Sequence, residues 1–581
     1  MSTHPGARSD RTVQQAAGGQ IPNRQPSDYR PSDAAPEDRA TAELAGAGRP
    51  AAVRQRSLRP GTQLSVVCER LDASGCGIAR CTDALPQGAL RAPGQSLGQP
   101  LIHVPNLLPG ERAHVKVVHV SSHVNRAAGA EPSEGRPLAF AALMHRYDAA
   151  PERQIPACGA FGQCGGCTLQ HLSYEAQLRF KHEQVGESLA DVLTPAVPPG
   201  FPAPPAGAQL QVAPCVASPQ PLSYRSRVKL VAAPTPVVPG AGQAAPRIIL
   251  GAYAPRSHRV IDMAGCKVNT PALRAVARTL GEQWGARGLS AYDEQTGHGA
   301  LRYVLLREVR SGAIQLSLVV ADPPPRAALL EVVAALRTAH PQLASVVLHH
   351  NPHPGNSLLA SADPTAGPAA ADSELGEADE QLLGPDFLYE DLGESPGLRL
   401  RVSARSFLQV NRAVTSRLYA EVAAALAVAP GELILDLYCG VGGLGRTLWR
   451  PGARLIGIET SASAVADAEH SARSAGLTAQ EARFLCGTVE EHLPGLSGAG
   501  ASQAATLVLL NPPRRGCTKG VLSAVLACAP RAIAYVSCSP QSLARDLATM
   551  TASGYALTQV TPYDMHPGTP HIETVALLRR T

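Results

Sequence analysis

Cys538 is the residue of this chain whose position most strongly suggests chemistry. It lies in the run Ile533-Ala-Tyr-Val-Ser-Cys-Ser-Pro540, where we expect a buried strand to end and a helix to begin. Ser539 is a good N-cap, and Pro540 suits the first helical turn because its missing N–H needs no partner there. A thiol at that junction meets the positive end of the helix dipole, which favours the thiolate. We therefore expect a nucleophile, the alternative being a small buried apolar residue.

A glycine-rich loop, Cys439-Gly-Val-Gly-Gly-Leu-Gly445, follows an apolar stretch upstream. Gly440 and its neighbours let the backbone approach a ligand closely, and Glu459 ends the next expected strand, where it can accept from both ribose hydroxyls. Asp436 precedes the loop, where its carboxylate could face the ammonium of a methionine. The glycines also match the dinucleotide pattern, so NAD is the alternative, but that pattern serves a pyrophosphate. We expect S-adenosylmethionine.

The segment Asn511-Pro-Pro-Arg514 ends a later expected strand, at the edge where doubly wound sheets bind ligands. Enzymes that methylate the exocyclic amine of adenine use an Asn-Pro-Pro motif followed by an aromatic residue, so adenine methylation is a rival. Position 514 is Arg, and that chemistry needs no thiol. Methylation of uracil C5 does need one, because C5 becomes nucleophilic only after a thiolate adds at C6.

Strands alternate with helices from about residue 402, which predicts an α/β domain with a parallel, doubly wound, Rossmann-like sheet over 402–581. The pattern predicts strands at 433–437, 454–458, 506–510, 532–536 and 574–578, and helices at 412–428, 461–475 and 540–553.

The rest of the chain divides into a tail, a small domain and a central α+β domain. Residues 1–57 are polar, without apolar periodicity, and are expected to be disordered. Alternating segments between glycine turns over 58–122 predict a small antiparallel, OB-like β-barrel. The central domain is expected over 150–400. Stretches rich in Pro, Ala and Gly, or acidic, are expected to be loop insertions: 194–208, 234–246 and 353–396.

Composition sets broad limits. The chain has 581 residues, a net charge of only +5 and 13 cysteines, so it is long enough for two or three domains and its charge argues weakly for a polyanionic partner. An odd cysteine count without a secretory leader does not suggest a disulfide framework. No apolar run approaches the roughly 20 residues that span a bilayer. We expect a cytoplasmic protein without membrane association.

Four cysteines outside the glycine-rich domain could hold a metal group. Cys158, Cys164 and Cys167 are clustered, and Cys266 lies far downstream. Four thiolates suit zinc or an iron–sulfur cluster equally well by ligand softness. Cys215 is the rival fourth ligand.

Several motifs together resemble the RNA 5-methyluridine methyltransferases of the RumA/TrmA group, in family order over about residues 60–580. They are Phe407-Leu-Gln-Val-Asn411, Asp436-Leu-Tyr-Cys-Gly-Val-Gly-Gly443, Asn511-Pro-Pro-Arg-Arg-Gly516, Val536-Ser-Cys-Ser-Pro540, Asp564-Met-His-Pro567 and His571-Ile-Glu573. The barrel is similar to a TRAM domain, which binds RNA.

The resemblance implies a role for each matched residue. Cys538 is the nucleophile at C6, and Glu573 is the base that removes the C5 proton. The residues implied to contact S-adenosylmethionine are Gln409, Tyr438, Glu459 and Asn511. The resemblance also favours a [4Fe–4S] cluster on Cys158, Cys164, Cys167 and Cys266. The target base would have to be flipped out of its stack to reach the thiol.

The RNA target is less sharply indicated. Asn511 and the glycine-loop motif are most similar to RlmC-like members, whereas the barrel is typical of RlmD-like ones, and His566 replaces the usual Phe. We expect 23S rRNA as the substrate, with tRNA second, and a monomeric enzyme. A non-catalytic RNA-binding protein is the alternative of another class.

Overall fold

The computed structural model describes residues 58–82, 101–125, 136–193, 210–235, 248–353, 379–393, 398–496 and 506–581. The expected tail at 1–57, most of the insertions at 194–208 and 234–246, and 354–378 lie outside these residues. Among the described residues, no helix combines the length and the apolar character that crossing a membrane requires.

The first described part is a closed five-stranded barrel with strand order β1-β2-β3-β5-β4. Its strands are β1 (Gln63–Leu71), β2 (Gly77–Cys81), β3 (Leu101–Val104), β4 (Arg112–Asn125) and β5 (Arg136–Arg146). Alternate apolar side chains, among them Val66, Ile102 and Val115, fill the interior. The barrel is longer than expected and not purely antiparallel, because β5 lies beyond residue 122 and closes the barrel by pairing in parallel with β3.

The central part is a seven-stranded sheet of order β12-β11-β10-β9-β6-β7-β8. The strands are β6 (Arg227–Pro234), β7 (Ile248–Tyr253), β8 (Val260–Asp262), β9 (Leu301–Glu308), β10 (Ile314–Val320), β11 (Leu343–His350) and β12 (Asp379–Leu383). Helices α2 (Pro271–Ala286) and α3 (Arg326–Ala339) share one apolar core with this sheet. The expectation of a loop insertion at 353–396 was wrong for its described part, because β12 and β13 (Phe387–Asp391) lie there. β13 forms a hairpin with β14 (Arg399–Ser403).

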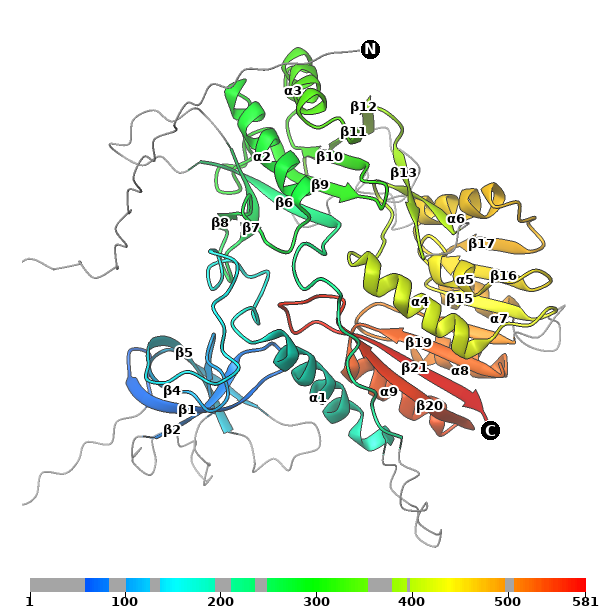
Figure 1. Cartoon of the computed structure of the whole chain (residues 1–581), viewed down its shortest axis with the longest axis horizontal. Helices are drawn as coiled ribbons and strands as arrows, with labels where there is room; N and C mark the ends of the chain where they lie inside the picture. Colours follow the sequence, from blue (N-terminus) through cyan, green and yellow to red (C-terminus); the bar gives the residue numbers. More distant parts are fainter. Residues whose placement is uncertain are drawn as a thin grey trace, which may run out of the picture. The chain divides into compact units, whose positions relative to one another are not determined.

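The C-terminal sheet has seven strands in the order β17-β16-β15-β18-β19-β21-β20 (Figure 1). They are β15 (Leu433–Leu437), β16 (Arg454–Glu459), β17 (Ala482–Cys486), β18 (Leu507–Leu510), β19 (Ala532–Ser537), β20 (Tyr555–Tyr563) and β21 (Glu573–Arg580). Five strands are parallel, as expected for a doubly wound sheet, whereas β21 pairs antiparallel with both β19 and β20. The expectation of a parallel sheet was therefore wrong for β21, whereas β20 runs in the same direction as the first five strands.

Both faces of this sheet are buried, which explains why its central strands are almost entirely apolar. One face carries α4 (Arg412–Leu426), α5 (Gly443–Leu448) and α6 (Ala462–Ser474). The other carries α7 (Val489–Leu496), α8 (Lys519–Ala527) and α9 (Pro540–Thr551). Helix α1 (Tyr174–Leu193), although it falls in the expected central domain, lies beside α9 and buries Val185 and Leu189 in the same core (Figure 1).

Candidate active site

The carboxyl edge of the C-terminal sheet collects the residues expected to bind the methyl donor. Parallel pairing of β15 with β16 and with β18 aligns the ends of three neighbouring strands. The side chains at these ends are Tyr438, Glu459 and Asn511, all partly exposed. This edge is the usual ligand-binding edge of an open α/β sheet.

The glycine loop is fixed by Glu459. One carboxylate oxygen of Glu459 accepts the backbone N–H of Gly440 at 3.0 Å. The other accepts the backbone N–H groups of Thr460 and Ser461 at 2.8 and 3.0 Å. Gly440 adopts a φ of 54°, a left-handed conformation that favours glycine. Each carboxylate oxygen has two lone pairs, so the oxygen facing Gly440 can still accept from a ligand hydroxyl.

Asp436 contacts the backbone of the glycine loop. Its side chain is 1% exposed, and Oδ2 accepts the backbone N–H of Gly445 at 2.9 Å. Burial raises the pKa of this carboxyl to about 7. The side chain of Asp436 thus holds the backbone at the start of α5. Its expected contact with a ligand ammonium stays a prediction.

Gln409 lies two residues after Phe407, in a segment whose backbone approaches the glycine loop at Gly440. The carbonyl oxygen of Phe407 lies 4.0 Å from where a Cβ on Gly440 would be. Gln409 is partly exposed in the same segment, and Phe407 leaves 58% of its surface exposed. Tyr438 has a φ of 62°, an uncommon value for a residue with a Cβ and one that is found at functional sites.

Cys538 and Glu573 come together at the end of an antiparallel pair. Ser537, the last residue of β19, pairs with Thr574 of β21, so the next position across is Cys538 opposite Glu573. Ser539 caps α9 by accepting the backbone N–H of Ser542, with Pro540 in the first turn, as the sequence predicted. Two residues far apart in the chain thus lie at one strand end.

The electrostatics of this pair differ from the expectation of a resting thiolate. Burial raises the pKa of the Cys538 thiol, and the charge of Glu573 adds to the rise, while Arg514 opposes it. The thiol is therefore protonated at rest, because burial outweighs the helix end. Glu573 is 4% exposed, and burial raises its pKa to about 7 against the opposing charge of Arg514. That value suits a general base at neutral pH.

Cys538 opens onto a cavity of about 370 Å³. The C-terminal part contributes Arg514, Gln541 and the segment 569–572 to its lining. Three other elements also contribute. They are the β1–β2 turn of the barrel through Ala73 and Ser74, the cysteine-rich segment (residues 158–168) through Gly165, Gly166 and Thr168, and α1 through Gln184. The sequence predicted none of these individual residues as part of the site.

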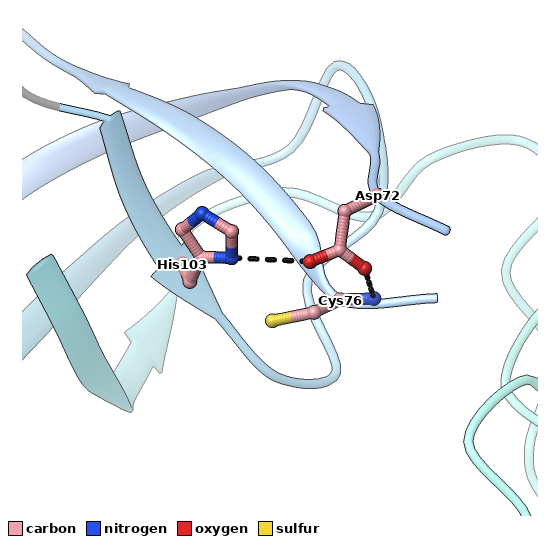
Figure 2. Close-up of side chains that lie close together, drawn as sticks. All are labelled: Asp72, Cys76 and His103. Atoms are coloured by element: carbon pink, nitrogen blue, oxygen red, sulfur yellow. Dashed lines mark hydrogen bonds and ion pairs between the residues drawn. The ribbon is translucent and has the colours of Figure 1, made fainter. Parts of the chain in front are cut away.

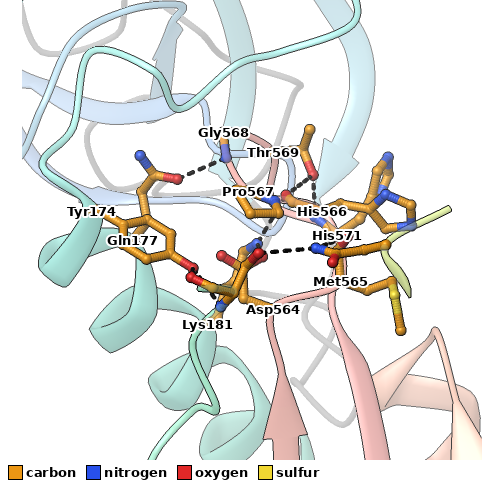
Figure 3. A network of polar contacts seen from close by, with 12 residues as sticks. Tyr174, Gln177, Lys181, Asp564, Met565, His566, Pro567, Gly568, Thr569 and His571 are labelled. Carbon is orange, nitrogen blue, oxygen red and sulfur yellow. Dashed lines mark hydrogen bonds and ion pairs between the residues drawn. The ribbon is translucent and has the colours of Figure 1, made fainter. Parts of the chain in front are cut away.

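The loop between β20 and β21 carries the motif Asp564-Met-His-Pro567 and leads to Glu573, the first residue of β21 (Figure 3). Lys181 of α1 and Asp564 form an ion pair at 2.5 Å with both side chains fully buried, and Lys181 also donates to the carbonyl oxygen of His566 at 3.1 Å. Gln177 of α1 accepts the N–H of Gly568 at 2.8 Å. Burial and neighbouring cations lower the pKa of His566 to about 3, so its ring is neutral. The loop is thus held in place by Gln177 and Lys181 of α1.

The four expected cluster cysteines line a second cavity, of about 360 Å³. Cys158, Cys164, Cys167 and Cys266 all contribute to its wall. Cys215 does not; its thiol lies near Asp564 and Lys181. The sequence preference for Cys266 over Cys215 therefore agrees with the placement of the side chains.

Comparisons with known proteins agree with this arrangement. A family model described as tRNA (uracil-5-)-methyltransferase matches residues 382–581. An uncharacterized RNA methyltransferase of Halalkalibacterium halodurans is 31% identical over 480 residues, which covers 82% of this chain and 92% of the relative. A second, of Listeria monocytogenes, is 30% identical and covers 84% and 94%.

The fold also has a solved counterpart. The tRNA (uracil-54, C5)-methyltransferase of Pyrococcus abyssi, solved with S-adenosyl-L-homocysteine, superposes with a TM-score of 0.59 at 22% identity, covering 89% of this chain and 100% of that one. At this identity the likeness shows the fold alone. Together with the relatives above, these findings show that the chain belongs to the RNA (uracil-5-)-methyltransferase family.

Proposed function

We propose that the protein uses S-adenosylmethionine to methylate C5 of a uridine in RNA through a covalent bond between Cys538 and C6. The observation that carries this proposal is the register that sets Cys538 opposite Glu573, with the thiol on the wall of a cavity of about 370 Å³. That volume lies within the range of small-molecule sites and admits one nucleotide. The nucleotide must leave its stack to enter.

The reaction follows from the properties of the two residues. Cys538 loses its proton to solvent and its sulfur adds to C6, which moves the electron pair of the ring double bond into an enolate and makes C5 nucleophilic. S-adenosylmethionine, when bound, would supply the methyl group that C5 takes up and would leave as S-adenosylhomocysteine. Glu573 then accepts the C5 proton, the double bond re-forms, and the thiolate leaves C6. The charge of Arg514 opposes the rise in the pKa of Cys538, and so favours the thiolate both when it attacks C6 and when it leaves.

The donor site is assigned to the carboxyl edge of the sheet. Glu459 is assigned to the ribose hydroxyls through the oxygen that faces Gly440, and Gly440 allows close approach of the donor to the backbone. The remaining contacts are assigned to Gln409, Tyr438 and Asn511. Asp436 supports the donor site indirectly, because its carboxylate accepts the backbone N–H of Gly445 and so holds the glycine loop in shape.

We assign a [4Fe–4S] cluster to Cys158, Cys164, Cys167 and Cys266. The four thiols line one cavity of about 360 Å³ together with other residues, which leaves more room beside them than a single zinc ion with Zn–S distances of about 2.3 Å needs. Arg225 and Lys229 line the same cavity, where their charge offsets that of the thiolates. The cluster is given a structural role, with no part in the methyl transfer.

The substrate we propose is 23S rRNA, on the strength of the motif resemblance. The alternative is tRNA, which is favoured by the description of the family model and by the substrate of the Pyrococcus abyssi enzyme. Mass mapping of 5-methyluridine in rRNA and tRNA from a deletion strain separates the two. Loss of a single 23S rRNA methylation is the expected result, and loss of a tRNA methylation overturns the choice of substrate.

The chemistry has its own test. RNA that contains 5-fluorouridine cannot lose a proton from C5, so it should remain bound to Cys538 as a stable covalent adduct. Cys538→Ala should form no adduct and no product, while binding RNA and S-adenosylmethionine normally. An enzyme that methylates adenine, or a non-catalytic RNA-binding protein, would form no adduct at all.

A further inference from the structure

The turn between β1 and β2 of the barrel is locked by Asp72 (Figure 2). Oδ1 of Asp72 accepts the backbone N–H and the hydroxyl of Ser74 at 2.8 and 2.6 Å, and the backbone N–H of Cys76 at 3.0 Å. Oδ2 lies 3.1 Å from Nδ1 of His103 on β3. These bonds fix the turn to the body of the barrel.

The same side chains have the types that bind a transition metal, with ligand atoms of Asp72, Cys76 and His103 all within 4.8 Å of one another. Both carboxylate oxygens, however, are already engaged by protein groups. Burial also raises the pKa of the Cys76 thiol to about 12, so that it stays protonated. The group therefore serves the shape of the turn.

This turn is fastened to the catalytic part of the molecule by two further hydrogen bonds. Gln184 of α1 donates to the carbonyl oxygen of Ala73 at 3.1 Å. The hydroxyl of Thr168 donates to the backbone carbonyl oxygen of Ser74 at 3.3 Å. Thr168 is also joined to the β20–β21 loop, because its N–H donates to the carbonyl oxygen of Gly568 at 3.1 Å. The turn, α1 and the loop that leads to Glu573 are thus one connected structure.

Gly75 shows how close this contact is. A Cβ at this position would lie 2.7 Å from Cδ2 of Leu169, and φ is +77°. A larger residue would push the turn away from the cysteine-rich segment. The barrel is therefore packed against Thr168 and Leu169 at this point.

We propose that the Asp72–Cys76 turn is a wall of the uridine site and that the Ser74 hydroxyl accepts a hydrogen bond from the target nucleotide. Ala73 and Ser74 are exposed, and both line the cavity that contains Cys538. This inference rests on the proposed function and deepens it, because it makes a barrel residue part of substrate recognition at the reacting base.

The bond to Asp72 decides which nucleotide groups Ser74 can meet. Its proton is committed to the carboxylate, so its oxygen offers only acceptor lone pairs. A uridine nucleotide has two donors: N3–H of the base and the ribose 2′-hydroxyl. Recognition of N3–H would favour uridine over cytidine, whereas recognition of the 2′-hydroxyl would favour RNA over DNA.

The first test is Ser74→Ala, measured as kcat/KM on substrate RNA with either uridine or 2′-deoxyuridine at the target position. The matched control is Ser311→Ala, an exposed serine in the turn before β10 that is outside the cavity lining. Loss of one neutral hydrogen bond should lower kcat/KM about twofold to tenfold, with the control unchanged. If the 2′-deoxy substrate makes Ser74→Ala harmless, the partner is the 2′-hydroxyl; if the two losses multiply, it is N3–H.

The second test is steric and does not depend on that bond. Ala73→Phe should fill the cavity, reduce formation of the 5-fluorouridine adduct at least tenfold and leave affinity for S-adenosylhomocysteine unchanged. Ala286→Phe, at the exposed end of α2, should behave like the wild type. If the wild type methylates uridine and neither Ser74→Ala nor Ala73→Phe changes adduct formation or kcat/KM, the inference about the turn is refuted. If the wild type forms no 5-methyluridine, the proposed function itself fails.

Discussion

Replacing Glu573 by Gln should stop the reaction after methyl transfer and leave RNA bound to Cys538. The adduct can release its methylated base only when a base removes the C5 proton, and a neutral amide cannot do so. Loss of a positioned general base slows a step about 100-fold to 10,000-fold. We therefore expect a covalent complex between the variant and ordinary uridine RNA, visible as a band that migrates slowly on a denaturing gel. The control is Glu469→Gln, on the exposed side of α6.

The pH dependence of the same step follows from the burial of Glu573. With a pKa of about 7, the carboxyl is about one tenth ionised at pH 6 and about nine tenths at pH 8. The base is active when ionised, so breakdown of the wild-type adduct should be about tenfold faster at pH 8 than at pH 6.

Breakdown is measured by forming the adduct at one pH, jumping to another and quenching at intervals. In the adduct the sulfur is a thioether and cannot titrate, so the raised pKa of Cys538 does not contribute to this profile. A rate that stays flat from pH 6 to pH 8, or full turnover by Glu573→Gln, would refute the assignment of Glu573 as the base.

Three further changes probe the donor site, the buried ion pair and the cluster. Glu459→Gln replaces the carboxylate that holds the glycine loop, and should weaken binding of S-adenosylhomocysteine about tenfold or more in a calorimetric titration, because bonds to a charged acceptor are the stronger ones. Asp564→Asn leaves the fully buried ammonium of Lys181 without its counter-charge, and should cost about 3 to 5 kcal/mol of stability, seen as a lower Tm; a second change, Lys181→Met, should restore part of it. Cys266→Ser should abolish bound iron and sulfide, whereas Cys215→Ser should retain both, with metal analysis as the measurement.

Local sequence signals were enough to place the elements that end in functional residues. Ser539 and Pro540 predict the start of α9, and the glycine run predicts the turn before α5, because caps and left-handed turns depend on the residues that form them. Strands whose existence depends on distant partners could not be found in this way. β12, for example, pairs with β11, and the residues beside β12 give no local indication of that pairing.

The chemical state of the site could not be read from local sequence either. The helix end beside Cys538 favours a thiolate, yet burial and Glu573 raise the pKa of the thiol. Asp436 likewise stands next to the glycine loop in the sequence, but it lies in β15, whose residues are all buried, and its carboxylate accepts the backbone N–H of Gly445. In both cases tertiary burial decides the outcome, and burial is set by elements far away in the chain.

The contacts around the β20–β21 loop connect the proposed cluster site with the proposed methyl-transfer site. The carbonyl oxygen of Gly568 accepts the backbone N–H groups of Thr168 and Leu169, which directly follow Cys167. From Gly568 the chain reaches Glu573 within a few residues. A cluster that anchors Cys167 would therefore fix the position of Thr168, and through it both the loop before Glu573 and the barrel turn that lines the cavity. Such a link predicts that loss of the cluster loosens Glu573 and the turn together, because they are held by the same residue.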